Sequence, residues 1–441
     1  MVWGSDGNLF EALDERLQRR YFQVVNEHSH VVNHLASGIS ALPKLAKPFA
    51  STQGLWRFFS NPEVTLPALI EPIHKLARET LIGNPSRFAL IVHDWSMLNY
   101  STHSSKQDRY QRSHATDLGY DASAALLLEA SEGAPVALME LSLRTSKKML
   151  STRASIKKRP CAHIDQVGAV MEASSTWGLD RTAVHLIDRE GDSVAHFREW
   201  SQAGHRFLVR ADDDRRVTWQ GQSILFKELV STLTKQDAFL RSNDVKYKGT
   251  WRQFHYAETS VVLDRPGKKR QGKRRIDVPG EPLPMRLVIT RVVDAKGKVL
   301  AQWLLLSNVE SEVSPLTLAT WYYWRWRIEN YFKLLKGAGL NVESWEQQSG
   351  EAIARRIVVA SMAIITVWLL LRSDSDQAKT IRLLLIRLSG RQMKWKVEST
   401  APALLAGMHS LLAMLNILEE YSADELRRII KQALPFRFDT S

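Results

Sequence analysis

The stretch that most constrains the fold is residues 321–339, Trp-Tyr-Tyr-Trp-Arg-Trp-Arg-Ile-Glu-Asn-Tyr-Phe-Lys-Leu-Leu-Lys-Gly-Ala-Gly. It contains no proline and closes on Gly337 and Gly339, which is typical of a helix followed by its stop signal. At about 100° of rotation per residue, one stripe of this helix carries a phenol, a carboxylate and cations: Tyr322, Arg325, Glu329 and Lys336, with Lys333 beside them. A neighbouring apolar stripe can anchor the helix to a core through Ile328, Phe332 and Leu335.

Two interpretations of the polar stripe are open. A carboxylate there can hold a divalent cation, and the cations beside it can hold phosphates. The alternative is an amphipathic helix whose charged face is only solvated and salt-bridged, as most helices rich in Glu, Arg and Lys are. The Trp and Tyr residues among 321–326 argue against an ordinary wet surface, but they do not decide between the two.

The spacing of this stripe also carries a resemblance. Tyr322-x-x-Arg325-x-x-x-Glu329-x-x-x-x-x-x-Lys336 resembles the Tyr-Arg-Glu-Lys signature of bacterial insertion-sequence transposases that use a DDE catalytic triad. The run Arg325-Trp-Arg-Ile-Glu329 resembles the cut-and-paste subgroup of that family. The resemblance implies that two aspartates lie upstream and belong to the same site as Glu329.

Two apolar runs upstream end in aspartates. Phe88-Ala-Leu-Ile-Val-His-Asp94 and Thr182-Ala-Val-His-Leu-Ile-Asp188 are both typical of a buried strand that delivers a carboxylate at its end. A lone Asp at such a position is more often a turn former than a ligand. Asp94-x-x-x-x-x-Tyr100 and Asp188-Arg-Glu resemble the first and second catalytic blocks of the family, which favours Asp94 and Asp188 as ligands.

The charge balance favours a polyanionic partner. Lys and Arg number 60 against 47 acids, a net charge of +13, which suits nucleic acid or an anionic membrane. Cys161 is the single cysteine, so neither an internal disulfide nor a cysteine-rich zinc site is expected. The N-terminus lacks an export signal, and the apolar run 357–371 is short for a membrane span, so we expect a buried helix and a soluble, cytoplasmic, nucleoid-associated protein without membrane contact.

Residues 1–85 and 211–300 differ in the secondary structure and the charge that their sequences indicate. Residues 1–85 are expected to be helical, and segment 53–62 resembles the family's end-recognition module; the alternative is a helical subdomain that only packs on the core. Residues 241–300 hold 15 Lys and Arg against 6 acids. We expect a β-rich insertion there that grips DNA phosphates, with 266–275 as a basic connecting loop; the alternative for that loop is a solvated, disordered turn.

The order of the expected elements predicts an α/β fold. Strands, a helix, further strands, an insertion and then the glutamate helix match an RNase H-like catalytic core with a β-rich insertion, a helical N-terminal DNA-binding module and a helical C-terminal region. The expected domains are an end-binding domain (1–85), the first part of the core (86–210), the insertion (211–300), the second part of the core (301–372) and a dimerisation region (373–441).

The resemblance also implies roles for individual residues. Asp94, Asp188 and Glu329 would bind Mg²⁺, for which Mn²⁺ can substitute, and the two-metal chemistry would cut and join DNA strands. Phosphates would be held by Arg325, Lys333 and Lys336 and by the Tyr322 hydroxyl. Arg210, at the end of strand 206–210, would approach DNA. The active species would be a homodimer on double-stranded DNA, holding transposon ends and joining them to target DNA.

Trp303 opens the run Trp-Leu-Leu-Leu, which resembles a family block whose tryptophan receives a flipped base. The alternative is a buried core tryptophan, because the strand around it is apolar.

Two other functions fit parts of the pattern. A metal-dependent nuclease would share the core without transposition, and sequence-specific binding by residues 1–85 would argue against it. A catalytically inactive DNA-binding inhibitor would not need Asp94, Asp188 and Glu329 together with the complete helix signature, although relics of mobile elements can keep such residues.

Overall fold

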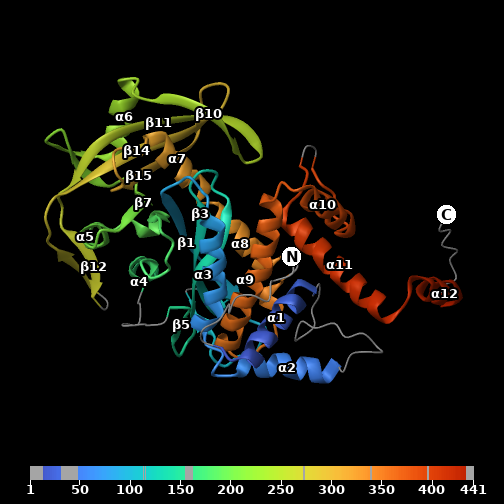
Figure 1. The fold of residues 1–441 in the computed structure, drawn as a ribbon. Coiled ribbons are helices and arrows are strands. Elements are labelled where there is room, and N and C mark those ends of the chain that lie inside the picture. The colour runs from blue at the N-terminus through green and yellow to red at the C-terminus, as the bar shows by residue number, and fades with distance from the viewer. Residues whose placement is uncertain are drawn as a thin grey trace.

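The computed structural model describes residues 13–30, 48–112, 114, 116–153, 162–271, 274–337, 340–394 and 397–433. These residues form a mixed α/β structure in which one large sheet is covered by helices on both faces (Figure 1). The α/β class expected from the sequence is therefore confirmed. Cys161 and the first residues of the predicted N-terminal module lie outside the described residues.

The centre of the sheet joins strands that are far apart in the chain. β3 pairs antiparallel with β1 on one side, and β6 pairs parallel with β1 on the other. β4 continues antiparallel from β3, and β7 continues in parallel from β6. The strands of this part are β1 (Phe88–Asn99), β2 (Tyr110–Gln111), β3 (Leu118–Glu129), β4 (Pro135–Arg144), β5 (Met149–Ser151), β6 (Thr182–Ile187) and β7 (Arg206–Arg210).

Residues 211–307 extend the same sheet. β15 pairs antiparallel with β7 and also with β14, so it joins the centre of the sheet to the extension. β11 follows β14, and β8, β9 and β10 complete the extension beside helix α6. These elements are β8 (Arg216–Trp219), β9 (Gln222–Leu225), α6 (Phe226–Lys235), β10 (Leu240–Tyr247), β11 (Thr250–Leu263), β14 (Leu283–Val293) and β15 (Val299–Ser307).

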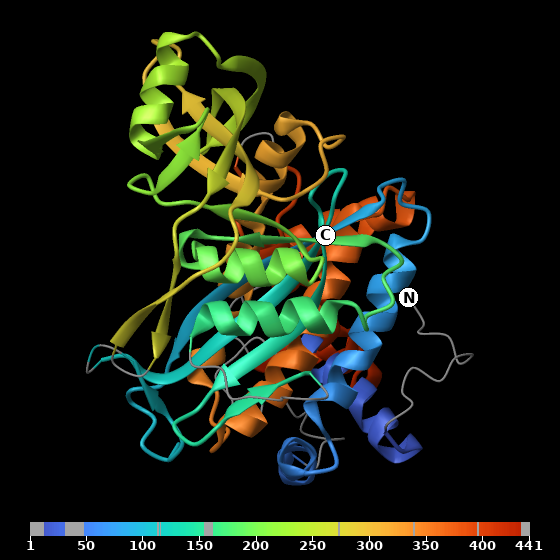
Figure 2. The ribbon, with the colours of Figure 1, turned by 90° about the vertical axis from the view of Figure 1, so that its left-hand side faces the viewer.

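Helices cover the two faces of the sheet unequally. α4 (His163–Ser174) and α5 (Val194–Gln202) lie across one face, and the orange helices, including α9 (Gly350–Arg372), lie behind the sheet (Figure 2). The larger hydrophobic core is on the α9 side, and it also takes buried side chains from the N-terminal helices and from α7 and α8. The bounds are α1 (Glu15–His30), α2 (Pro48–Ser60), α3 (Leu66–Leu81), α7 (Pro315–Trp324) and α8 (Arg327–Lys336).

The N-terminal helices share that core. Tyr21 of α1, Phe59 of α2 and Leu69 of α3 are buried in the same cluster as Leu90 of β1. The described part of residues 1–85 therefore packs on the core, which both interpretations of this segment allow. Recognition of DNA ends by the same segment stays a prediction.

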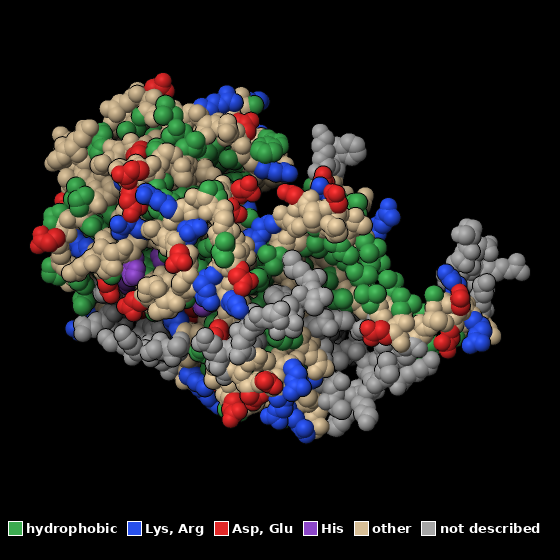
Figure 3. Space-filling view, viewed as in Figure 1, with side chains coloured by type: hydrophobic (Ala, Val, Ile, Leu, Met, Phe, Trp, Pro, Cys, Tyr) green, Lys and Arg blue, Asp and Glu red, His purple; other side chains and the backbone are tan. Residues whose placement is uncertain are grey.

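Among the residues that the structure describes, two helices are long and apolar enough to cross a membrane by length and composition. In α9, 83% of the most apolar window is buried, as expected for the core helix predicted around 357–371. In α11 (Ala401–Glu420) only 29% of that window is buried. Figure 3 shows hydrophobic side chains along α11, and the exposed ones include Met414, Leu415 and Leu418. The two remaining helices are α10 (Asp376–Leu388) and α12 (Ala423–Ala433).

The structure corrects the continuous helix predicted from residue 321 onwards. α7 ends at Trp324 and α8 begins at Arg327. The hydrogen bonds across the break are of the tighter i→i−3 type, such as Arg325 N–H to Tyr322 O and Glu329 N–H to Trp326 O. Three consecutive aromatics of α7 pack on residues of different strands: Trp321 on Phe88, Tyr322 on Trp303 and Tyr323 on Phe254. This tertiary packing overrides helix propensity.

Two further expectations are corrected. β1 does not end at Asp94 but continues to Asn99, because β3 pairs with it along its whole length. The predicted basic loop 266–275 contains a two-stranded hairpin, β12 (Gly267–Gln271) with β13 (Arg274–Val278), which lies beside α5.

Arg355 of α9 provides a test of how the N-terminal helices are attached. Its buried guanidinium donates to the backbone oxygens of Val64 and Phe59, at 2.6 Å each, and pairs with Glu351 at 2.9 Å. We expect Arg355→Met to lower the free energy of unfolding by about 3 kcal/mol, because it leaves buried carbonyls unsatisfied. Urea denaturation measures this change. Lys379→Met, on the exposed side of α10, is the control and should change stability little; equal effects of both would contradict the attachment.

Candidate active site

The register of two parallel strands places two carboxylates side by side. The pairs between β1 and β6 run from Phe88 opposite Thr182 to Val92 opposite Leu186. Two residues further on, the same register sets Asp94 opposite Asp188. Because β6 ends at Ile187, Asp94 lies where its parallel neighbour stops, although β1 itself continues.

The loop after β6 holds Asp188 in place. Its Oδ1 accepts the backbone N–H of Glu190 at 2.9 Å, which caps the short 3₁₀ helix Arg189–Gly191. β7 continues the parallel register with Ile187 opposite Val209, so Arg210 lies next in line beside Asp188. Asp192, further along this loop, pairs with Arg215 at 2.6 Å.

The break between α7 and α8 brings a guanidinium to the same place. Arg325 Nη1 lies 3.7 Å from Asp94 Oδ2, and the Arg325 side chain is only 9% exposed. Its Nε and Nη1 have no hydrogen-bond acceptor among the described residues. Tyr322, itself buried, lies beside Arg325, whose guanidinium carbon is 5.8 Å from the phenol ring centroid.

The pKa shifts of the buried groups indicate which charges lie within electrostatic range of one another. Burial raises the pKa of Asp94; the Arg325 charge and the Trp95 N–H oppose this rise, and the charges of Asp188 and Glu329 add to it. For Arg325, burial lowers the pKa, but Tyr322, Asp94 and Asp188 outweigh it, so the net pKa is raised. The structure therefore brings together Asp94, Asp188, Glu329, Arg325 and Tyr322. For Tyr322, burial raises the pKa, and the charges of Arg325 and Arg210 oppose the rise, so Arg210 belongs to this group too.

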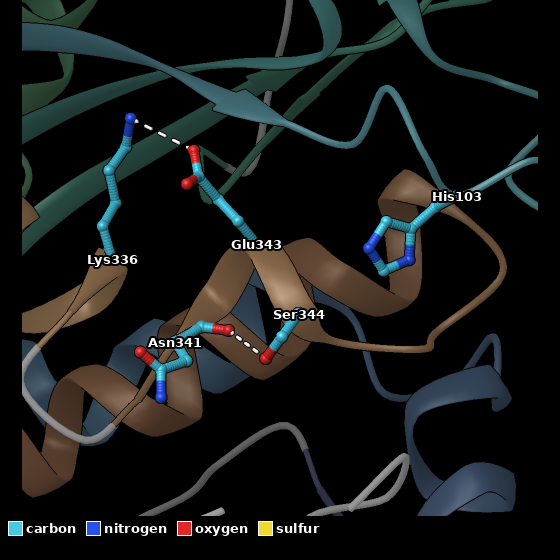
Figure 4. A pocket seen from close by; sticks show the side chains of 5 residues that line it. All are labelled: His103, Lys336, Asn341, Glu343 and Ser344. Atoms are coloured by element: carbon cyan, nitrogen blue, oxygen red, sulfur yellow. Dashed lines mark hydrogen bonds and ion pairs between the residues drawn. The ribbon is translucent and has the colours of Figure 1, made fainter. Parts of the chain in front are cut away.

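The two lysines of the predicted stripe lie further along α8. Lys333 is exposed. Lys336 Nζ donates to Met97 O at 2.5 Å and pairs with Glu343 at 3.3 Å. Figure 4 shows this pair at a pocket of about 310 Å³ whose other lining residues are His103, Asn341 and Ser344. Lys336 therefore lies beside β1, and its hydrogen-bond and ion-pair partners are groups of the protein itself.

Trp303 lies in the core. Its side chain is 6% exposed and its ring centroid lies 6.3 Å from that of Tyr322. The indole faces are covered by protein in this structure, which favours the packing alternative that the sequence left open. Trp303 supports the site from behind by packing on Tyr322.

The carboxylates are close but do not form a metal-ligand set as they stand. Within the described ranges, no three His, Cys, Asp or Glu side chains converge enough to hold a metal ion. Asp94 divides its oxygens between the Trp95 N–H, at 2.9 Å, and Arg325. The site thus holds a group of negative charges, and Arg325 is the cation that lies next to Asp94.

Sequence reasoning missed a charged cluster behind the Asp188 loop. The His163 ring lies between two carboxylates, with Nε2 2.7 Å from Asp121 Oδ2 and Nδ1 3.4 Å from Glu190 Oε2. The Trp95 ring stacks on it with centroids 4.4 Å apart. Only a protonated imidazole can donate to both carboxylates. His163 thereby ties the loop that carries Asp188 to strand β3.

The histidines of strands β1 and β6 differ from His163 because, among the described residues, they are not paired with carboxylates. His93 and His185 are buried and share a hydrogen bond of 2.9 Å. Burial lowers the pKa of His93 to about 3 and that of His185 well below its usual range. The pair is therefore uncharged near neutral pH and belongs to the core.

Comparison of the sequence with models of known protein families finds no match, and comparison with curated proteins finds none either.

The His163 cluster predicts a pH-dependent contribution to stability. Burial lowers the His163 pKa, but the hydrogen bonds and charges of Asp121 and Glu190 outweigh it, so the net pKa is raised above about 6.5. The contribution is fully present below the unfolded pKa and is lost as pH rises through the folded pKa. We expect the stability gap between wild type and His163→Gln to shrink over that rise, as measured by denaturant unfolding at a series of pH values.

His255→Gln is the matched control for this experiment. Burial and neighbouring arginines lower the pKa of His255, so its contribution should change in the opposite sense, falling as pH falls. A stability difference between wild type and His163→Gln that stays constant between about pH 5 and pH 8 would contradict a charged His163 between Asp121 and Glu190.

Proposed function

We propose that this chain is a DNA transposase of the DDE type, which binds the ends of a mobile element and moves it by metal-dependent cut-and-paste transposition. The observation that carries the proposal is that Asp94 lies within electrostatic range of both Asp188 and Glu329, although the three carboxylates do not converge into a ligand set as they stand. They come from three separate segments, and parallel pairing of β1 with β6, together with the packing of α8 on β1, brings them to one place. The same three residues stand in the motifs that resemble the family's catalytic blocks.

The topology supports an RNase H-like core as part of the proposal. The strand order β4-β3-β1-β6-β7 has an antiparallel meander on one side of β1 and parallel strands on the other. In that arrangement the acid after β6 lies beside the acid on β1. The extension through β15, β14 and β11 is then an insertion between the second acid and the glutamate helix.

The types of residue at the site, though not their present spacing, suit a divalent cation. Three carboxylates supply hard oxygen ligands, which Mg²⁺ and Mn²⁺ prefer. The charges of Asp188 and Glu329 help to raise the Asp94 pKa, which means that the site holds negative charge that a cation relieves. Asp94, Asp188 and Glu329 would hold the ion, which supplies Lewis-acid activation of the attacking and leaving oxygens.

In this proposal Arg325 binds the DNA backbone. Two of its buried nitrogens lack acceptors among the described residues, and a phosphate oxygen supplies what they lack. Tyr322 and Asp94 hold the guanidinium in position. Arg210 is close enough for its charge to oppose the rise in the Tyr322 pKa, and exposed Lys333 lies one turn after Glu329 on α8. These residues bind and orient phosphate, while the carboxylates serve the metal.

A homodimer on DNA remains part of the proposal. Exposed apolar side chains lie on two C-terminal helices, including Leu383 and Leu384 of α10 and Leu415 and Leu418 of α11. A second copy of the chain would cover such a surface. Each copy would then hold one DNA end.

Asp188→Asn tests the proposed reaction. Asparagine keeps the shape of the side chain but removes charge that holds the cation, so cleavage of DNA flanking the reading frame, in Mg²⁺ or Mn²⁺, should fall by about 10²-fold or more. Binding of the same DNA should persist. Asp180→Asn is the control, because Asp180 is exposed near the other end of the same strand and has a positive φ that asparagine tolerates.

Cleavage by wild type in excess chelator, or full activity of Asp188→Asn, would refute the proposed chemistry. Metal-dependent cleavage without preference for the flanking sequence would instead favour the simpler RNase H-like nuclease.

A further inference from the structure

The β10–β11 hairpin carries an exposed aromatic residue among cations at its tip. β11 pairs with β14 only from Gln253 onwards, so the segment from Val245 to Arg252 projects as a free two-stranded ribbon. Trp251, at 65% exposed, stands directly opposite Lys246 in the register, so both side chains lie on one face of the ribbon. Figure 1 shows the hairpin reaching beyond the end of the extended sheet.

The turn at the tip of the hairpin has a lysine in the left-handed backbone conformation. Lys248 and Gly249 have φ values of 49° and 83°, the signature of a type I′ turn. The first position of that turn favours asparagine, aspartate or glycine, and a lysine there adopts a left-handed conformation that its side chain disfavours. A Cβ on Gly249 would meet nothing within 4 Å, so the tip is in open space. Lys248 Nζ lies 5.5 Å from the ring centroid of the neighbouring Tyr247.

The charges of the ribbon are available to an anionic partner. Arg241 pairs with Asp244 at 3.7 Å and the Arg252 charge acts on Asp294, which leaves Lys246 and Lys248 as the surplus positive charge near Trp251. Neither Lys246 nor Lys248 has a carboxylate partner among the described residues. At this end of the molecule Figure 3 shows hydrophobic and Lys or Arg surface side by side.

The ribbon is also fixed to the candidate active site. The Tyr323 hydroxyl donates to Lys246 O at 2.6 Å, and its ring packs near Phe254 of β11. Tyr323 directly follows Tyr322, which lies against Arg325. A register shift in β10 between Ser242 and Val245 turns the ribbon near its base. The tip therefore keeps a defined position relative to the site.

We propose that this ribbon is a second DNA contact, in which Trp251 stacks on an unpaired base beside the candidate cleavage site while Lys246 and Lys248 bind the flanking phosphates. An aromatic face with cations around it is the combination that holds unpaired nucleobases irrespective of sequence. The inference depends on the proposed function only in taking DNA as the substrate.

The test compares two labelled DNA duplexes that differ only in a central run of mismatched bases. Binding to the full-length chain is followed by fluorescence anisotropy in chelator, so that no cleavage is needed. Wild type should bind the mismatched duplex more tightly. Trp251→Ala should lose about ten-fold on the mismatched duplex and little on the matched one, whereas Trp251→Phe should keep most of the preference.

Leu240→Ala is the matched control, since Leu240 is 60% exposed on the same hairpin but far from its tip; it should bind both duplexes as wild type does. Lys248→Gln should lower the slope of log affinity against log salt by about one on both duplexes. Thermal unfolding of each variant verifies that the hairpin change leaves the fold intact.

An equal loss by Trp251→Ala on both duplexes, or no loss on either, overturns the stacking role. A Trp251→Ala variant that changes the oligomeric state in sedimentation, with DNA affinity unaltered, would show that the tip contacts a second copy of the chain instead. Failure of the catalytic proposal is recognised separately, because Asp188→Asn would then cut DNA as wild type does while the Trp251 effect persists.

Discussion

The candidate site depends above all on the parallel pairing of β1 with β6. Parallel strands must be connected by a crossover, and the chain uses the long path through β3, β4 and α4 for it. A slip of one residue in this register would turn Asp94 or Asp188 towards the opposite face of the sheet. The apolar residues from Ala89 to Val92 and from Val184 to Ile187 are buried, and this burial fixes the register. Hydrophobic packing thus determines the distance between two charged groups that contribute little to the core.

The site keeps negative charge in a partly buried place by balancing it locally. Arg325 lies against Asp94, Tyr322 packs beside Arg325, and Trp303 closes the back of Tyr322. On the other face, His163 links Asp121 to the loop of Asp188. The carboxylates are therefore held between two supporting layers, one aromatic and cationic and the other built around an imidazole. Such support restricts their rotamers before any ligand arrives.

Local pattern was sufficient to predict much of the fold. The apolar runs around 88–94 and 182–188 form strands. The spacing of Tyr322, Arg325 and Glu329 predicted that they share a face. The break at Arg325 was not predictable from periodicity, because it results from packing of consecutive aromatics on strands that lie far away in the sequence. The burial of Trp303 and the link from His163 to Asp121 depend on tertiary contacts for the same reason.

The position of β15 has a consequence for protein engineering. Because β15 pairs on one side with β7 and on the other with β14, the extension is continuous with the centre of the sheet. A shortened chain without residues 211–298 would turn β15 into a bare edge strand, with Leu304, Leu305 and Leu306 beside unpaired backbone groups. Exposed apolar edges of this kind pair with other chains and aggregate. The extension is thus also a protective cover, and a soluble minimal core requires a substitute strand or charged residues along that edge.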